Sequence, residues 1–160
     1  MSQSADFHSI NFILDTAYVY NSWNNFHLIP SSRPNIVAPQ RSFKYVDIPG
    51  RSGSLDLTTY LTGETPVYGD RSGSLEFVVI REYEGKIIDD RPWYDRKQEL
   101  INFFDGHIMR IQLEDDPRYY YEGRVTLESW QTGEAYSAIT INYRLKPYKY
   151  DSATGQEAGI

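Results

Sequence analysis

The sequence predicts a mainly β domain, either an antiparallel β-sandwich or an open barrel, with one α-helix packed on its flank. About seven or eight segments show the two-residue alternation of apolar and polar side chains that is typical of half-buried strands. Only one segment shows the spacing of an amphipathic helix. Aromatic residues make up 15% of the chain, with fourteen tyrosines, and aromatic side chains favour strands and protein interfaces.

Length and composition narrow the classes of protein that fit. A chain of 160 residues favours one domain, which we place at residues 1–150, followed by a flexible C-terminal tail at residues 151–160. There are no cysteines, so disulfides and thiolate chemistry are excluded. The net charge of -6 argues against tight nucleic-acid binding. The N-terminus does not read as a signal peptide and no apolar run could span a bilayer, so we expect no membrane contact.

The first half of the chain predicts strands joined by turns and one extended link. Residues 10–20 predict one strand or two short ones, because they are rich in β-branched and aromatic residues. Residues 28–39 contain three prolines and predict an extended connection. Further strands are expected at 41–50, ending at Pro49 and Gly50, at 54–61 and at 74–83, with a turn-rich link at 61–70.

Residues 91–106 predict the helix. Asp89 and Asp90 precede it, where carboxylates can cap free amides, and Pro92 suits the first turn. The apolar face is expected to contain Trp93, Leu100, Ile101 and Phe104. Gly106 is expected to end the helix at its C-terminus.

The second half of the chain returns to the two-residue period. Met109, Ile111 and Leu113 predict a strand, and the run Asp115–Asp116–Pro117 predicts a turn after it. Two more strands are expected at 119–130 and 136–148, joined as a hairpin by residues 131–135. One face of the last strand should carry Ile139, Ile141, Tyr143 and Leu145, and Pro147 ends the pattern.

The pentapeptide RSGSL occurs at residues 51–55 and again at 71–75. Two copies are too few for a solenoid, which needs three or more. A phosphate-binding loop would lead into a helix, whereas both copies lead into predicted strands. We therefore interpret them as two turns, with Gly53 and Gly73 supplying turn geometry and Leu55 and Leu75 as the first inward residues of the strands.

No residue pattern indicates catalysis. Paired carboxylates occur only as neighbours, at Asp89–Asp90 and Asp115–Asp116, where the two side chains point apart. The histidines, His8, His27 and His107, share no metal-ligand spacing. No serine lies in a nucleophile-elbow sequence. We expect no enzyme activity, no catalytic residues, no bound metal and no cofactor.

A carbohydrate-binding β-sandwich that binds host cell-wall polysaccharide is the alternative. Trp23, Trp93, Trp130 and the run Tyr119–Tyr120–Tyr121 could supply rings for stacking on sugars. In a strand, however, Tyr120 would point to the opposite face from its two neighbours, and at least one tyrosine should be in the core.

The segment from Val46 to Phe77 resembles the signature of the distal tail proteins of phages that infect Gram-positive bacteria. In that family a Pro-Gly turn leads to a Gly-x-Leu-Asp-Leu-Thr strand, followed by Tyr-x-x-Arg and a strand that ends in Phe. The matching residues are Pro49, Gly50, Gly53, Leu55, Asp56, Leu57, Thr58, Tyr68, Arg71 and Phe77.

The resemblance covers residues 7–150 in order. The helix end with Gly106, the strand–turn–strand with Asp116, Gly123 and Arg124, and the closing strand before Pro147 all look like family elements. Ser52 departs from the pattern, since the family often has Asp there. Many members also carry a second, C-terminal domain that this sequence does not show, which puts direct host binding in doubt.

The resemblance implies a structural virion protein at the tip of a phage tail. Such proteins form rings, usually homohexamers, in which a tail-tube-like domain joins its sheet to those of its neighbours and surrounds the DNA channel. The implied partners are the major tail tube protein, the hub or tail-associated protein, receptor-binding proteins and the tape measure protein. Phage DNA would pass through without specific binding, and assembly would occur in the host cytoplasm.

Within that resemblance, Arg71 and Arg124 are candidates for ion pairs in the domain or between ring subunits, because arginine makes bidentate contacts with carboxylates. Asp56 is the nearest candidate partner of Arg71. The sequence predicts that Arg71→Ala weakens the ring or the domain.

Overall fold

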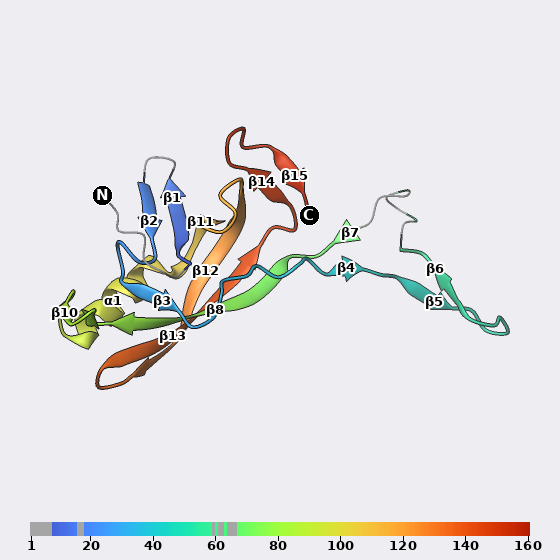
Figure 1. Cartoon of the computed structure of the whole chain (residues 1–160). Helices are drawn as coiled ribbons and strands as arrows, with labels where there is room; N and C mark the ends of the chain where they lie inside the picture. Colours follow the sequence, from blue (N-terminus) through green and yellow to red (C-terminus); the bar gives the residue numbers. More distant parts are fainter. Residues whose placement is uncertain (1–7, 16–17, 59, 61–62, 64–66) are drawn as a thin grey trace.

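The computed structural model describes residues 8–15, 18–58, 60, 63 and 67–160. Its main sheet is antiparallel throughout, in the order β2-β1-β11-β12-β13-β8-β3, and it curls into a half-barrel (Figure 1). This confirms the predicted mainly β fold in its open-barrel form. The strands of this order are β1 (Ile10–Asp15), β2 (Tyr18–Asn21), β3 (Leu28–Pro30), β8 (Arg71–Ile80), β11 (Asp105–Leu113), β12 (Tyr119–Thr132) and β13 (Tyr136–Leu145).

The core lies on one face of this sheet, because every second side chain of each strand points to that face. Leu75, Phe77 and Val79 of β8 are buried, as the sequence predicts. Ile139, Ile141, Tyr143 and Leu145 of β13 are also buried on the same face. The two strands pair over their full length, with Phe77 opposite Ile139 and Leu75 opposite Ile141. Direct opposition of apolar side chains stabilises the sheet and sets its register.

The helix α1 (Trp93–Phe103) packs against β11 and β12 and closes the core. Leu100 and Phe104 are buried, and the rings of Phe104 and Phe12 of β1 meet edge to face at 5.0 Å. Two predictions about its ends are wrong. Pro92 occupies the N-cap and no side chain caps the helix, because Asp89 binds arginines instead.

The helix also ends before Gly106. Phe104 is the C-cap, and its N–H bonds to the carbonyl of Leu100. Gly106, at φ 74°, lies in β11 instead, where the register against β12 shifts. The glycine therefore allows the chain to turn directly from the helix into the strand.

The two RSGSL copies have different structures, so the interpretation as two turns is half wrong. Gly53 has φ 77° in the turn before β6 (Ser54–Asp56), as predicted. Gly73, in contrast, lies inside β8 opposite Tyr143. A Cβ at Gly73 would lie 2.7 Å from Cζ of Tyr143. The first glycine serves a turn, and the second makes room for an aromatic ring.

The described parts of residues 40–70 leave the sheet and form a protruding arm (Figure 1). Its base is the pair β4 (Arg41–Ser42) and β7 (Val67–Tyr68), and its outer part is the hairpin of β5 (Tyr45–Asp47) and β6. The strands predicted at 41–50 and 54–61 are therefore short, and they lie outside the main sheet. The predicted link at 61–70 falls partly outside the described residues.

The C-terminus also differs from the sequence prediction. The sequence predicted a flexible tail from residue 151, but β14 (Lys149–Asp151) and β15 (Glu157–Gly159) form a hairpin, and β14 pairs with the start of β12. Tyr150 stacks on Tyr120 with ring centres 5.4 Å apart. Tyr120 lies on the sheet face opposite the core, where Tyr150 and the Arg110 guanidinium, 4.8 Å from the ring centre, cover its ring. A small hairpin, β9 (Glu82–Tyr83) with β10 (Lys86–Ile87), completes the strands.

Within the described residues, none of the helices has the length and apolar character needed to cross a membrane.

Candidate assembly surfaces

The arm carries five of the eleven assembly positions that the sequence singled out: Pro49, Gly50, Gly53, Asp56 and Tyr68. Pro49, Gly50 and Gly53 form the turn at its tip, and Asp56 lies in β6. The arm exposes large side chains that a monomer would bury. Phe43 and Tyr45 are each 60% exposed, and their rings stack at 6.4 Å. Exposed aromatic patches of this kind mark binding surfaces.

Short-range polar contacts hold the arm in shape. The Ser54 hydroxyl donates to the Asp47 carboxylate at 2.5 Å, and the Thr58 N–H donates to Asp56 at 2.9 Å. Hydrogen bonds to Asp56 from Thr58 lower the pKa of that carboxyl. Asp56 thus shapes the arm locally and does not pair with Arg71, which corrects the candidate pairing.

Tyr68 lies at the shoulder where the arm meets the sheet. Its ring contacts the ring of Tyr148 edge to face at 6.2 Å, and the Arg41 guanidinium lies over it at 5.8 Å. These contacts join the arm's base to the segment that follows β13. The predicted motif residue therefore anchors the arm.

Arg71 is buried just below this shoulder, with only 4% of the residue exposed. Its Nε donates to the carbonyl of Pro147 and its Nη1 to the carbonyl of Val37, both at 2.9 Å. Its guanidinium also lies 5.0 Å from the ring centre of Tyr121. Arg71 therefore fastens three segments to β8 through their backbones and a ring.

Burial shifts the pKa values of Arg71 and of Tyr121, the ring beside it. Desolvation lowers the pKa of Arg71 and raises the pKa of Tyr121. The Tyr143 hydroxyl accepts a hydrogen bond from the N–H of Val37 at 3.0 Å. Val37 is thus held through both its carbonyl and its amide. The predicted ion pair is replaced by hydrogen bonds to carbonyls, which a guanidinium with five donors can satisfy.

The remaining predicted positions are spread over the β11–β12–β13 region. Arg124 donates to the carbonyl of Gly106 at 2.8 Å, and it forms no ion pair among the described residues. Gly123 lies in β12 opposite Leu145. Asp116 lies in the predicted turn and binds Arg118 at 3.1 Å. These residues fix strand connections and do not converge on one site.

The sequence analysis missed a second buried arginine, Arg96 of α1, which is 2% exposed. Its Nη1 donates to the carbonyl of Ile80 at 2.6 Å and its Nη2 to the carbonyl of Phe26 at 3.1 Å. Its Nε lies 3.3 Å from the Asp89 carboxylate. The sequence did offer one sign that Arg96 is buried: it lies four residues before Leu100, and therefore on the same face of the helix.

Asp89 lies between two arginines. Arg91 donates to both of its oxygens, at 3.0 Å and 2.8 Å, and these hydrogen bonds hold the pKa of Asp89 at about 2 despite partial burial. Burial and the nearby Arg96 charge lower the pKa of His27. Together these side chains tie the start of the helix to the end of β8 and to the loop before β3.

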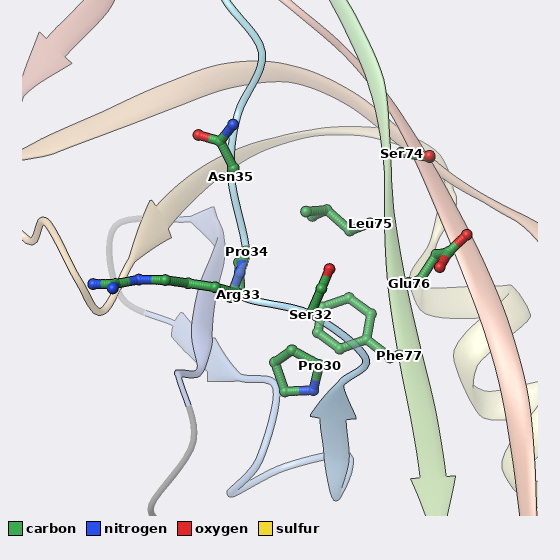
Figure 2. A pocket seen from close by; sticks show the side chains of 9 residues that line it. All are labelled: Pro30, Ser32, Arg33, Pro34, Asn35, Ser74, Leu75, Glu76 and Phe77. Atoms are coloured by element: carbon green, nitrogen blue, oxygen red, sulfur yellow. The ribbon is translucent and has the colours of Figure 1, made fainter.

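A hollow of about 200 Å³ lies between β8 and the proline-rich segment that follows β3 (Figure 2). Pro30, Ser32, Leu75 and Phe77 face it, whereas Arg33 points away and Glu76 lies on the other side of β8. The side chains that face it thus place no acid beside a base. Arg33 instead reaches Asp115 at 2.8 Å.

The aromatic residues considered for sugar binding pack among themselves in separate places. Trp93 and Trp130 meet edge to face at 6.3 Å, and Trp23 meets Tyr83 edge to face at 4.9 Å. Tyr120 is buried under the C-terminal hairpin. The tryptophan rings and Tyr120 therefore form no common flat surface on which a sugar could stack.

The sheet face opposite the core is polar over the first half of β8 and the strand residues opposite it. Three cross-strand pairs of β8 and β13 point outward: Ser72 opposite Arg144, Ser74 opposite Asn142, and Glu76 opposite Thr140. Arg144 binds the Asp70 carboxylate at 2.8 Å. Arg124 lies opposite Arg144 on the same face and forms no ion pair among the described residues, and Ile108 beside it is 54% exposed.

Two strand edges of the main sheet have open stretches. Among the described strands, β2 pairs with β1 alone, and Tyr18 and Val19 are exposed there. At the opposite edge, β3 pairs with Phe77–Val79 of β8 and the Ser31 N–H donates to the Glu76 carbonyl at 3.0 Å. No described strand pairs with Arg71–Leu75 on that side, although the proline-rich segment runs beside part of it. An open edge presents unpaired backbone groups to a neighbouring chain.

A groove of about 540 Å³ lies at the end of the molecule opposite the arm. Its walls come from the end of β8, the β9–β10 hairpin, the segment before α1 and the loop between β12 and β13. Its lining combines apolar and acidic side chains: Ile80, Arg81, Glu82, Ile87, Asp90, Glu134, Ala135 and Tyr136.

This chain is similar to known proteins in its structure, but no match is found from its sequence. No protein-family profile matches the sequence, and no curated protein sequence matches it. Among solved structures, the chain is similar to the SPP1 Dit (gp 19.1) protein, described as a paradigm of the hub adsorption apparatus in phages that infect Gram-positive bacteria. The TM-score is 0.52 at 15% identity, over 89% of this chain and 52% of that chain. The chain thus spans about half of that protein and shares its fold.

Proposed function

We propose that this protein is a structural subunit of a phage tail tip that forms a ring, hexameric by family resemblance, around the DNA channel. The observation that carries the proposal is the similarity in fold to a phage hub adsorption protein over 89% of the chain. The family signature at residues 46–77 supports the same proposal from the sequence.

Open strand edges support a ring. A chain with open edges on both sides of its sheet can add a neighbour at each side, and closure of the ring leaves no edge free. In this account β2 of one copy faces the β8 side of the next. The exposed side chains of Tyr18 and Val19 would then be covered by the neighbour.

The polar outer face supports a channel wall. Lysines on such a wall would bind DNA phosphates and slow its passage. Three cross-strand pairs of β8 and β13 on this face carry hydroxyls, an amide, one carboxylate and Arg144, whose charge is paired with Asp70. Arg124, opposite Arg144 on β12, is the arginine of this face that has no ion pair among the described residues. We assign this face to the channel, where DNA passes without specific binding.

The proposed partners are the major tail tube protein on one side of the ring and the hub or tail-associated protein on the other. Receptor-binding proteins and the tape measure protein are further candidates. The protein would act in the virion after assembly in the host cytoplasm, without catalysis or a cofactor.

Electron micrographs of the purified protein, alone and after mixing with the tail tube protein of the same phage, test this proposal. We expect closed rings with a central hole, stacked on the end of tube assemblies in the mixture. Single particles without rings in both samples would contradict it.

A further inference from the structure

The arm and the groove at the opposite end of the molecule have complementary surfaces, and no other described segment of the chain covers either of them. An isolated two-stranded hairpin is at best marginally stable in water. The arm nevertheless keeps Phe43, Tyr45 and Ile48 exposed. A second surface is therefore needed to cover it.

Residues 41–56 of the arm carry one more cation than carboxylate, although residues 40–70 as a whole contain three cations and four carboxylates. Residues 41–56 contain all three cations, Arg41, Lys44 and Arg51, and two of the carboxylates. Both carboxylates accept hydrogen bonds from neighbouring hydroxyl or amide groups of the arm. Among the described residues Lys44 and Arg51 form no ion pair, so their charge is available to a partner.

The groove is acidic where it is exposed. Glu82, Asp90 and Glu134 line it, and within the described part of the chain no cation lies at ion-pair distance from them. The one basic residue of its lining, Arg81, turns toward the helix: it donates to the carbonyl of Asp90 and lies 5.3 Å from the ring centre of Trp93.

The groove also offers apolar surface. Ile87 is 67% exposed, and Tyr136 is exposed beside it. An apolar centre with a charged rim is typical of protein interfaces. Ile48 and Tyr45 of an arm could cover these side chains while Arg51 approaches the carboxylates.

We propose that the arm of one copy of this chain docks in the acidic groove of the next copy. The arm and the groove lie at opposite ends of the molecule, so a chain cannot fill its own groove (Figure 1). Each copy therefore donates one arm and receives another. Head-to-tail contacts of this kind close into a ring when the rotation permits. The inference rests on the proposed ring and names the surfaces that join it.

Cysteine cross-linking tests the contact directly, because the chain has no cysteine of its own. Ile48→Cys at the arm tip is mixed with Ile87→Cys in the groove under mild oxidation. The matched control replaces Ile87→Cys with Ile108→Cys, which is 54% exposed on β11. We expect a mixed covalent dimer in the first pair at about tenfold the yield of the control pair, a difference of about 1.4 kcal/mol in apparent affinity.

Charge reversal gives an independent readout. Adding Glu82→Lys and Glu134→Lys to the Ile87→Cys chain should lower the cross-link yield about tenfold, since like charges then face each other. Glu128→Lys, on β12 and exposed, is the control and should leave the yield unchanged. The yield of the parent pair should also fall with added salt, because exposed charges are screened.

Light scattering on the same samples separates the two proposals. Rings that form without cross-linking above the control overturn arm docking and leave the ring intact. Cross-linking in a species no larger than a dimer supports docking and contradicts the ring. Monomers without cross-linking overturn both.

Discussion

Arg71 and Arg96 show how two buried cations hold this small domain together. Each guanidinium donates to two backbone carbonyls from segments far apart in the sequence: Val37 and Pro147 for Arg71, Phe26 and Ile80 for Arg96. Carbonyls of loops and strand ends have no partner within regular structure, and burial without a donor would destabilise the fold. The two arginines meet this need at the two ends of β8.

The first prediction concerns Arg71. Arg71→Ala leaves the carbonyls of Val37 and Pro147 without their donors, so we expect the free energy of unfolding to fall by about 2 to 4 kcal/mol. Arg144→Ala is the matched control in the neighbouring strand. Its ion pair with Asp70 is exposed, so its removal should change stability by less than about 1 kcal/mol. Urea denaturation measures both, and equal losses would contradict the role assigned to Arg71.

The second prediction concerns pH. Folding lowers the pKa of Asp89 from the usual value of 3.8 to about 2. The carboxylate therefore stabilises the folded state above about pH 4, and this contribution disappears as the pH falls toward about 2. We expect Asp89→Asn to cost about 2 kcal/mol at pH 7. The difference from the parent chain should shrink between pH 4 and pH 2 in thermal melts, and a constant difference would argue against it.

The third prediction distinguishes the two pentapeptides. Gly73→Ala would push a methyl group into the ring of Tyr143, and overpacking of this kind costs about 1 to 3 kcal/mol. Gly53→Ala meets no atom within 4 Å and strains only the arm's turn, so the core should melt as before. Calorimetry of both variants measures the contrast. A lower melting temperature for Gly53→Ala than for Gly73→Ala would reverse the assignment.

The sequence predicted the burial of side chains that follow the two-residue period of a strand. It did not predict the burial of side chains outside such a pattern. Leu75, Phe77 and Val79 alternate, and burial follows from alternation. Arg96 shares a buried helix face, but its charge argues for exposure until its carbonyl partners are known. Asp89 precedes the helix, where a capping residue would lie, but its carboxylate binds Arg91 and Arg96 and does not cap the helix.

The arm is the element that sequence periodicity described least well. Its strands alternate like those of the sheet, since Val46 pairs with Leu55 across the hairpin. Alternation alone does not reveal whether a strand has a core to cover. The family signature located the right residues, and the structure shows that several of them form a projecting hairpin.

The fourth prediction removes this element. β4 and β7 pair at Ser42 and Val67, so an Asn-Gly turn could join these residues in place of 43–66. We expect the shortened domain to melt within a few degrees of the parent, because the core lies elsewhere. Assembly should be lost in light scattering. Full assembly of the shortened chain would show that the arm is not needed.

At the scale of the whole molecule, the sequence predicted the hairpin that joins β12 and β13, and the structure confirms this pairing. The sequence did not predict the order of the strands. The placement of β1 beside β11 could not be predicted, because it depends on contacts between residues about a hundred positions apart in the sequence. The C-terminal hairpin was missed because its residues are small and polar, and its stability comes from Tyr150 on Tyr120.

The mass of the purified protein in solution tests the central claim most directly. Six copies of 18.6 kDa give a ring of about 112 kDa, and light scattering should report this mass at low salt, independent of elution volume. A mass of 18.6 kDa at all concentrations, unchanged when tail tube protein is added, would contradict the account of this chain as a ring subunit.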